Sequence, residues 1–360
     1  MQVFDCKTKI VSGEDALSWL DKHHCRCLLV VTDPYFRQNG WADRIAGRVQ
    51  AEKREFFDKV KPDPTVELAA EGTALMRQLQ PDMLIALGGG SAMDTAKAMV
   101  YFAGENVKFI AIPTTSGSGS EVTNFAILTH GAVKHPLIDK RILPDVAILA
   151  EELVEKLPPS LVADGGFDVL SHALEAFVAT NATTVTRALA AGAFRQTLKH
   201  LPASFRGEIS VRKQIHQASN MAGIAFAQSG LGMCHALSHS LGGIFHIPHG
   251  RLNGILLPEV VARNSVAAGR EYGEIARMAG IEGSADRICA RNLRNTLTGL
   301  RKELRLPATL KEAGVQSGEL YRHMEEIVTA ALADPCMQTN PVKADREMLL
   351  SVLQAVSGFA

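Results

Sequence analysis

Short apolar runs alternate with segments of helical periodicity through the first half of the chain. Residues 27–32 (CLLVVT), 83–87 (MLIAL) and 108–112 (KFIAI) are mainly apolar runs, which are typical of strands buried on both faces of a sheet. Residues 67–80 repeat apolar positions with the period of an amphipathic helix, and residues 92–102 form a second helical segment. Strands separated by helices predict βαβ units and a parallel sheet that is covered on both faces.

The pattern changes after residues 157–160 (LPPS), where the strand signals cease. The remainder is alanine-rich, has few β-branched runs, and predicts successive helices. Breaks between these helices are expected at Pro202, Gly207, Gly230, Gly243 and Pro307. Since 360 residues exceed the size of one hydrophobic core, two domains are expected. We place an α/β domain at residues 1–157 and an all-helical domain at residues 158–360, with a ligand site expected in the cleft between them.

Charge and composition narrow the class of partner. The 38 Lys and Arg residues balance 38 Asp and Glu residues, and no basic run occurs, so nucleic acid is not an expected partner. No stretch reaches the ~18 apolar residues that a membrane span needs, and residues 1–10 lack an apolar signal core. The six cysteines have no repeated spacing and are expected to be reduced thiols in a cytoplasmic protein.

Glycine and hydroxyl side chains follow two of the predicted strands. GGGS occupies residues 88–91 and PTTSGSGS occupies residues 113–120. Because ligands of parallel sheets bind at the carboxyl ends of the strands, these loops are placed to bind one. Glycines let the backbone approach closely, and free N–H groups at a following helix attract phosphate. Each loop alone is equally typical of a tight turn. The pair favours a phosphate-bearing ligand, although GGGSxxD differs from the GxGxxG dinucleotide motif.

Asp33 closes the first strand, at a third carboxyl end of the predicted sheet. An acidic side chain in this place can accept hydrogen bonds from ribose hydroxyls and would repel a 2′-phosphate. It therefore favours NAD over NADP. The alternative is that Asp33-Pro34 simply begins a turn.

Four of the twelve histidines gather in residues 230–251: His235, His239, His246 and His249. His235 and His239 are four apart in a helical segment, so both rings project from one face. Gly242-Gly243 and Pro248 are expected to break the helix and return His249 on a turn. Gathered imidazoles are typical of a transition-metal site, although each could also be an ordinary polar residue of a half-buried helix.

Asp168 and His172 supply a carboxylate and a further imidazole, again four apart on one helical face. With the histidine segment they form an oxygen and nitrogen donor set suited to divalent iron or zinc. Spacing alone favours His235 and His239 as the remaining ligands and leaves His246 and His249 as alternatives. Asp168 could instead belong to an ordinary helix start.

Four motifs together resemble the iron-containing, group III alcohol dehydrogenases. They are GGGSAMD (88–94), PTTSGSGSEVT (113–123), DVLSHALEAF (168–177) and GLGMCHALSHSLGGIFHIPHG (230–250). They occur in the family's order and span nearly the whole chain. Within that family, KPDPT (61–65), HIPHG (246–250) and ALADPCMQTNP (331–341) are most similar to the 1-propanol dehydrogenases of propanediol-utilisation microcompartments.

The resemblance implies a dehydroquinate synthase-like fold, with an α/β nucleotide-binding domain followed by an all-α metal-binding domain. It implies that the metal ligands are Asp168, His172, His235 and His249, and that His239 is an active-site histidine beside the nicotinamide. The residues implied for dinucleotide binding are Asp33, Asp63, Gly89, Gly90, Ser91, Asp94, Thr114, Thr115, Thr123, Lys134 and Leu153.

The implied cofactors are NAD(H) and Fe²⁺, with Zn²⁺ as the alternative metal. Such a metal acts as a Lewis acid toward a substrate oxygen, while the nicotinamide carries the hydride. We expect His239 to relay the alcohol proton, with a further metal contact as its alternative role. The expected reaction interconverts short primary alcohols and aldehydes, most specifically propionaldehyde and 1-propanol. The alternatives are a lactaldehyde, diol or glycerol dehydrogenase and a non-catalytic microcompartment protein.

The resemblance also indicates the protein's setting. It implies a homodimer or larger homo-oligomer in the cytoplasm or inside a bacterial microcompartment. An aldehyde dehydrogenase and a microcompartment shell protein are the candidate partners.

Overall fold

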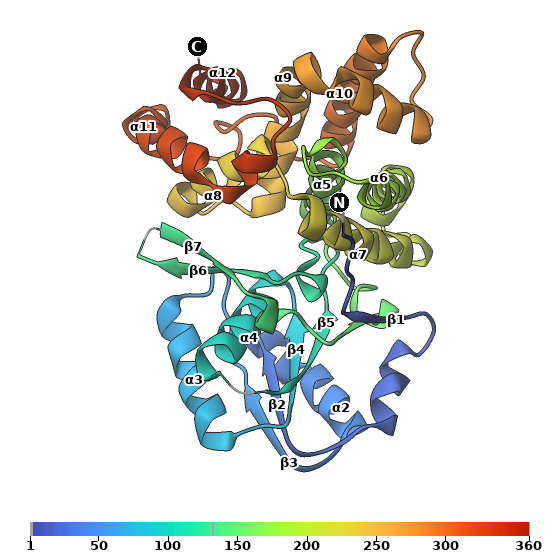
Figure 1. Ribbon diagram of the computed structural model, residues 1–360, viewed down its shortest axis with the longest axis vertical. Helices are drawn as coiled ribbons and strands as arrows, with labels where there is room; N and C mark the ends of the chain where they lie inside the picture. Colours follow the sequence, from blue (N-terminus) through green and yellow to red (C-terminus); the bar gives the residue numbers. More distant parts are fainter. Residues whose placement is uncertain (1–2, 105, 132, 360) are drawn as a thin grey trace. The chain divides into compact units, whose positions relative to one another are not determined.

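The computed structural model describes residues 3–104, 106–131 and 133–359. These residues fall into two compact units, Asp5–Leu157 and the chain from Pro158 onward together with residues 3 and 4 (Figure 1). Each unit has its own set of secondary-structure elements.

A six-stranded sheet forms the centre of the first unit in the described part of the chain. Its strands are β1 (Lys9–Ser12), β2 (His24–Thr32), β3 (Gln50–Phe57), β4 (Met83–Gly88), β5 (Lys108–Pro113) and β8 (Val146–Leu149). They lie in the order β1-β8-β5-β4-β2-β3, and every pairing between neighbours is parallel. The predicted parallel sheet is therefore confirmed. An antiparallel hairpin of β6 (Phe125–His130) and β7 (Val133–Ile138) is separate from this sheet.

The helices of this unit cover both faces of the sheet. They are α1 (Pro34–Gln38), α2 (Trp41–Arg48), α3 (Val66–Leu79) and α4 (Gly90–Ala103), with the short 3₁₀ helices η1 (Ala16–Lys22), η2 (Ser120–Val122), η3 (Lys140–Ile142) and η4 (Glu151–Leu153). Figure 1 shows α2 on one face and α3 and α4 on the other.

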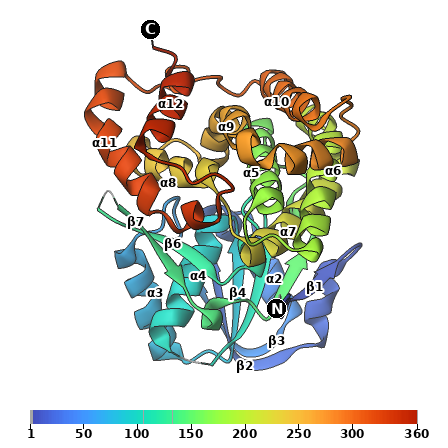
Figure 2. The same ribbon diagram turned by 45° about the horizontal axis from the view of Figure 1, so that its top comes forward.

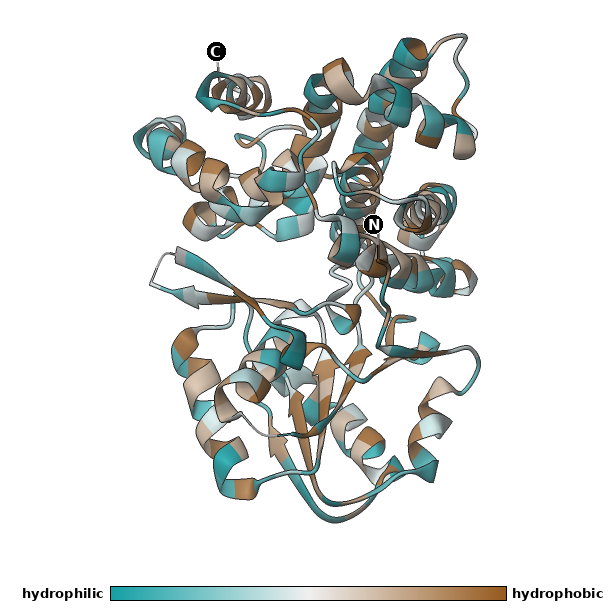
Figure 3. Cartoon of the chain, viewed as in Figure 1, coloured by the Kyte–Doolittle hydropathy of each residue, from teal (hydrophilic) through white to brown (hydrophobic). Residues whose placement is uncertain are grey.

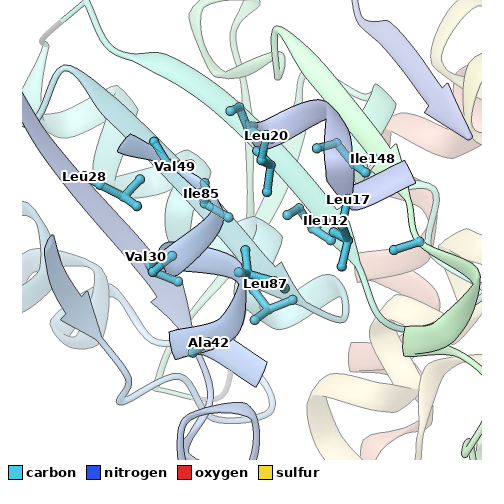
Figure 4. Close-up of a cluster of buried hydrophobic side chains, with 14 of the residues drawn as sticks. Leu17, Leu20, Leu28, Val30, Ala42, Val49, Ile85, Leu87, Ile112 and Ile148 are labelled. Carbon is cyan, nitrogen blue, oxygen red and sulfur yellow. The ribbon is translucent and has the colours of Figure 1, made fainter. Parts of the chain in front are cut away.

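Alternation along each strand supplies one core to each face. Leu28 and Val30 of β2 pack with Ile85 of β4 on the face of η1 and α2, where Figure 4 shows these side chains together. Leu29 and Val31 point to the opposite face and pack with residues of α3 and α4. Because both faces are covered, the buried stretches of the central strands, residues 27–31, 83–87 and 109–112, are apolar without interruption, and Figure 3 shows the strands of this unit mainly in brown.

The strand order reverses between β2 and β4. After β2, the chain adds β3 on one side of β2 and then β4 on the other side. The topological switch point therefore lies between β2 and β4. Thr32 pairs with Leu87 at the carboxyl ends of the two strands. Asp33 therefore follows β2 next to the glycines that follow β4.

The second unit consists of helices in its described residues. They are α5 (Pro159–Val178), α6 (Thr184–Phe205), α7 (Arg212–Ser229), α8 (Met233–Phe245), α9 (His249–Met278), α10 (Asp286–Glu303), α11 (Ser317–Ala333) and α12 (Arg346–Ser357), with η5 (Ile209–Val211) and η6 (Pro335–Thr339). Helix α5 packs against α6, α7 and α9, and α8 packs against α9 and α11 (Figure 2). No helix in residues 3–104, 106–131 and 133–359 is both long enough and apolar enough to cross a bilayer.

Two of the expected helix breaks are wrong. Helix α6 continues through Pro202 to Phe205, and α8 continues through Gly242 and Gly243, which are both buried, to Phe245. The break comes instead at His246, whose φ of 53° is left-handed and ends the helix. Pro248 then precedes the first residue of α9, His249. The turn predicted to return His249 is thus present, but it begins after the glycines.

Candidate functional site

Three helices bring Asp168, His172, His235 and His249 together. Asp168 and His172 lie one turn apart on α5, His235 lies in the first turn of α8, and His249 begins α9. One potential ligand atom from each of the four side chains lies within 4.8 Å of those from the others. Asp168, His172 and His235 are buried and His249 is half-buried. We call these four residues the Asp/His cluster.

Close packing of α9 on α5 places His249 in this cluster. A Cβ atom on Gly250 would lie 2.0 Å from the backbone oxygen of Asp164, so only glycine allows this approach. The next residue, Arg251, donates from Nη2 to Asp164 Oδ2 at 3.0 Å. The first turn of α9 is therefore fixed against α5 beside Asp168.

The separations in the Asp/His cluster fit a divalent metal. Asp168 Oδ1 lies 3.7 Å from His172 Nδ1, 3.9 Å from His235 Nε2 and 3.5 Å from His249 Nε2. Four ligands about 2.1 Å from one tetrahedral ion would lie about 3.4 Å apart. The Asn253 amide nitrogen lies 2.9 Å from Asp168 Oδ1, 3.2 Å from His249 Nε2 and 3.5 Å from His235 Nε2, so these atoms converge on one region. The donor set of one carboxylate and three imidazoles suits Fe²⁺ or Zn²⁺.

Electrostatics also favours a cation in this cluster. Burial raises the pKa of the Asp168 carboxyl to about 7, although a hydrogen bond from Asn253 opposes the change. Burial lowers the pKa of the His235 imidazole well below its usual range, so that ring is neutral near pH 7. A buried carboxylate beside this neutral imidazole is stabilised by a divalent cation.

Glu175 is a candidate site residue that the sequence analysis missed. It lies seven residues after Asp168 on the same face of α5 and is buried. Its carboxylate accepts hydrogen bonds from the backbone N–H groups of Gly232, Cys234 and His235, and lies 2.7 Å from His235 Nδ1. Glu175 thereby holds the start of α8, and keeps the proton of His235 on Nδ1 so that Nε2 faces Asp168. The only sequence signal is its helical spacing from Asp168 and His172.

His239 lies beside the Asp/His cluster and belongs to a different group. Its ring stacks on His249 with 5.2 Å between centroids, and its Nδ1 lies 2.8 Å from Asp334 Oδ2. His239, Asp334 and Cys336 form a second set of neighbouring polar atoms. Spacing alone favoured His239 as a ligand, whereas the structure places His249 with Asp168. His246 is exposed at the end of α8 and lies outside both groups.

In the other unit, the two glycine loops lie against each other. A Cβ atom on Gly89 would lie 3.2 Å from the Thr115 side chain, and one on Gly90 would lie 3.5 Å from Ser118. The Thr114 backbone N–H donates to the Gly88 carbonyl at 3.0 Å. Helix α4 starts at Gly90 and its N-cap makes no side-chain hydrogen bond, so the N–H groups of Gly90 and Ser91 would donate to an anion bound there, whereas the Ala92 N–H donates to the Gly89 carbonyl at 3.0 Å.

Asp33 is next to these loops. Its Oδ1 atom accepts from the Phe36 backbone N–H at 3.1 Å and caps α1. Its Oδ2 atom lies 3.9 Å from the position of a Cβ atom on Gly88. The structure therefore brings Asp33, Gly89, Gly90, Thr114 and Thr115 together at the switch point, with half-buried Ser91 in the first turn of α4.

Three further residues implied for dinucleotide binding contact other residues of the protein: Asp63, Lys134 and Leu153. Asp63 and Lys134 form an ion pair at 2.7 Å. Leu153 is buried in the core beside β8. Their contacts with a dinucleotide stay predictions.

Asp94 and Thr123 join a buried lysine that the sequence analysis did not single out. Lys97 Nζ donates to Ser120 Oγ, Thr123 Oγ1 and the Phe125 carbonyl at 2.7–3.0 Å. Asp94 accepts from Ser120 Oγ at 3.1 Å. Burial lowers the pKa of the Lys97 amine to about 8. This network fixes η2 and β6 against α4, and the dinucleotide contacts of Asp94 and Thr123 also stay predictions.

Sequence comparison matches both parts of the chain to one family. A family model described as "Iron-containing alcohol dehydrogenase" matches residues 7–151, and one described as "Fe-containing alcohol dehydrogenase family, C-terminal" matches residues 162–357. The resemblance predicted from the four motifs is confirmed.

Two relatives are similar over nearly their whole lengths. The NADPH-dependent butanol dehydrogenase of Clostridium saccharobutylicum is 36% identical over 354 residues, which cover 92% of this chain and 91% of the relative. The 1-propanol dehydrogenase PduQ of Salmonella typhimurium is 36% identical over 367 residues, which cover 98% and 99%. Both relatives are alcohol dehydrogenases by name.

A solved structure agrees in fold over the full chain. Sulfoacetaldehyde reductase from Bifidobacterium kashiwanohense, in complex with NAD⁺, has a TM-score of 0.89 and 25% identity, and the similarity covers 100% of both chains. The predicted fold class is confirmed. The predicted cofactors, iron and NAD(H), are confirmed for the family by its description and by this NAD⁺ complex.

Proposed function

The chain belongs to the iron-containing alcohol dehydrogenase family, and we propose that it reduces short aliphatic aldehydes with NADH, preferring propionaldehyde. As a member of that family it is an oxidoreductase that interconverts alcohols and aldehydes. The proposal adds the substrate, the preference for NAD(H), and the residues that bind the metal and the dinucleotide.

The Asp/His cluster is the observation that carries the proposal. We assign Asp168, His172, His235 and His249 as ligands of Fe²⁺, with Zn²⁺ as the alternative, because their donor atoms converge at separations suited to one ion. When bound, the metal supplies Lewis acidity toward the substrate oxygen, and the nicotinamide donates or accepts the hydride.

The protein's own side chains orient the ligands and move the proton. Glu175 keeps His235 Nε2 free of a proton, and the Asn253 amide donates to Asp168 Oδ1. His239 lies against His249 and is the group assigned to proton transfer. During reduction it gives a proton to the aldehyde oxygen, and during oxidation it takes the alcohol proton.

The switch point of the sheet supports dinucleotide binding. Phosphates would accept hydrogen bonds from the first turn of α4 and from the hydroxyl side chains of Thr114 and Thr115. The carboxylate of Asp33 favours a free ribose 2′-hydroxyl over a 2′-phosphate, so we assign NAD(H) rather than NADP(H). Gly89, Gly90 and Ser91 line the same turn, and Asp63, Asp94, Thr123, Lys134 and Leu153 complete the assignment.

Similarity supports the choice of substrate and setting. The chain is 36% identical to a 1-propanol dehydrogenase over 98% of its length, and residues 61–65, 246–250 and 331–341 resemble that subfamily. We extend the proposal to a homodimer or larger homo-oligomer in the cytoplasm or a microcompartment. An aldehyde dehydrogenase or a shell protein would be its partner there.

Aldehyde-dependent oxidation of NADH tests the proposal. Protein purified without oxygen and supplied with Fe²⁺ should oxidise NADH when propionaldehyde is added. Its oxidation of NADH should be faster than its oxidation of NADPH. Repeating the assay with Zn²⁺ in place of Fe²⁺ tests the alternative metal. No turnover with any C2–C4 aldehyde would overturn the proposal, and faster turnover of lactaldehyde or glycerol would replace its substrate with that of the diol enzymes.

A further inference from the structure

Asp334 links the C-terminal motif ALADPCMQTNP to His239. It follows α11 and precedes η6, 95 residues after His239 in the chain. Asp334 Oδ2 lies 2.8 Å from His239 Nδ1, and both side chains are mostly buried, with exposures of 15% and 14%. The distance is that of a short, charge-assisted hydrogen bond.

The two carboxylate oxygens of Asp334 have different partners. Oδ1 accepts from the Cys336 backbone N–H at 2.8 Å and caps η6. Oδ2 contacts the imidazole and is not needed for the cap. The contact with His239 is therefore additional to the structural role of the residue.

A carboxylate partner determines which nitrogen of an imidazole carries the proton. Because an ionised carboxylate only accepts hydrogen bonds, His239 Nδ1 must be the donor. Nε2 is then the nitrogen that gains and loses a proton. The ring lies 5.2 Å from the His249 ring and 6.1 Å from the His235 ring, so this imidazole is beside the Asp/His cluster.

We propose that Asp334 is a positioning residue for proton transfer by His239, holding Nδ1 protonated and the ring beside the Asp/His cluster. The inference rests on the proposed aldehyde reduction. As hydride from NADH reaches the carbonyl carbon, the N–H bond at Nε2 of the doubly protonated ring breaks and an O–H bond forms on the substrate. His239 is left neutral with its Nδ1–H on Asp334, and Nε2 regains a proton from water. Alcohol oxidation by NAD⁺ is the reverse.

Four variants separate positioning from folding. Asp334→Asn removes the charge and can present an N–H group to Nδ1. Asp334→Ser keeps an oxygen that can cap the Cys336 N–H but is too short to reach the imidazole. His239→Ala removes the group through which Asp334 acts. The double variant His239→Ala/Asp334→Asn tests whether loss of the Asp334 charge still lowers kcat when the imidazole is absent.

Steady-state kinetics with propionaldehyde and NADH, together with iron content, give the first result. Both Asp334 variants should lower kcat by about 10²–10³-fold, with KM within about threefold and iron content unchanged. The double variant should be no slower than His239→Ala. Wild-type kcat in Asp334→Ser would overturn the proposal. A decrease in kcat of the double variant equal to the product of the decreases in the two single variants would also overturn it.

A spectroscopic measurement is independent of turnover. In ¹⁵N-histidine-labelled, metal-free protein, the signals lost in His239→Ala identify this ring. They should show an Nδ1–H form in the wild type and lose it in Asp334→Asn. An Nε2–H form in the wild type contradicts the proposal. An Nδ1–H form in a protein that reduces no aldehyde would preserve the positioning contact while overturning the proposed function.

Discussion

Glu175 contacts the nitrogen of the His235 imidazole opposite to the one that faces Asp168. Its carboxylate contacts the His235 imidazole and three backbone N–H groups at the start of α8. A glutamine of the same shape would place its NH₂ group against at least one of these donors. If that group faces Nδ1, the His235 proton moves to Nε2, the nitrogen that faces Asp168.

We expect Glu175→Gln to weaken Fe²⁺ and Zn²⁺ binding by about 10- to 100-fold, measured by chelator competition. Asn340→Ala is the control, because Asn340 accepts from the Met233 N–H at the same helix start and its other hydrogen bonds within the described residues go to Asn264 and Val342 rather than to an imidazole. Wild-type metal affinity in Glu175→Gln would show that the carboxylate does not support the ligand.

Asp33 determines the preference for the dinucleotide in this account. Asp33→Asn keeps an acceptor for the Phe36 N–H and removes the negative charge. Because the charge repels a 2′-phosphate, the variant should shift the ratio of kcat/KM for NADH over NADPH toward NADPH by about tenfold, a change of about 1.4 kcal/mol. An unchanged ratio would indicate that a residue other than Asp33 discriminates between NADH and NADPH.

Pairs of potential ligands four residues apart were predictable, whereas Glu175 and Asp334, which act through a histidine on another segment, were not. Asp168 with His172 and His235 with His239 could be found because pairs four apart share a helical face. Spacing could not decide between His239 and His249, since the choice depends on the packing of α9 against α5. Glu175 and Asp334 are single acidic residues whose partners lie 60 and 95 residues away.

At the scale of elements, continuous apolar strands were predictable because both faces of the sheet are covered. The runs at β2, β4 and β5 carry this signal. Strand β3, with the sequence QAEKREFF, is an edge strand that is largely exposed, so its sequence has no apolar run. Strands β1 and β8 have only four residues each, which is too short for a periodic signal.

The end of α8 provides a prediction of stability. His246 has φ 53° and ψ 31°, a left-handed conformation that costs a non-glycine residue about 1 kcal/mol or more. His246→Gly removes this cost, while the greater freedom of glycine in the unfolded chain offsets part of the gain. The thermal midpoint should rise by a few degrees at unchanged kcat. A lower midpoint would indicate that the imidazole makes a stabilising contact.

Helix α7 provides a prediction of pH dependence. Burial lowers the pKa of His216 to about 4, whereas an unfolded histidine titrates near 6.5. Between these values the unfolded chain binds a proton that the folded protein does not, so the free energy of unfolding falls as pH decreases from about 6.5 to 4.

His216→Phe removes this proton uptake. Between pH 7.5 and pH 5, the free energy of unfolding of the wild type should fall by about 2 kcal/mol more than that of the variant, measured with urea. Equal pH dependence in the two proteins would contradict the assignment of a buried neutral imidazole to His216.

At the scale of the molecule, the class of each unit was predictable and its arrangement was not. Alternating strands and helices imply a parallel sheet, but the order β1-β8-β5-β4-β2-β3 depends on contacts between distant segments. The position of β1 beside β8 joins residues 9–12 to residues 146–149. Likewise, the meeting of α5, α8 and α9 that forms the Asp/His cluster is a result of tertiary packing.

The stoichiometry of metal binding tests the central claim most directly. Chelator-treated protein is titrated with Fe²⁺ without oxygen, and bound iron is measured after removal of free ion. The wild type and His246→Gly should each bind one ion per chain, because His246 lies outside the Asp/His cluster. His249→Ala should bind none at the same concentration, since it lacks one of the four assigned ligands. One ion per chain retained by His249→Ala at wild-type affinity would contradict the assigned ligand set.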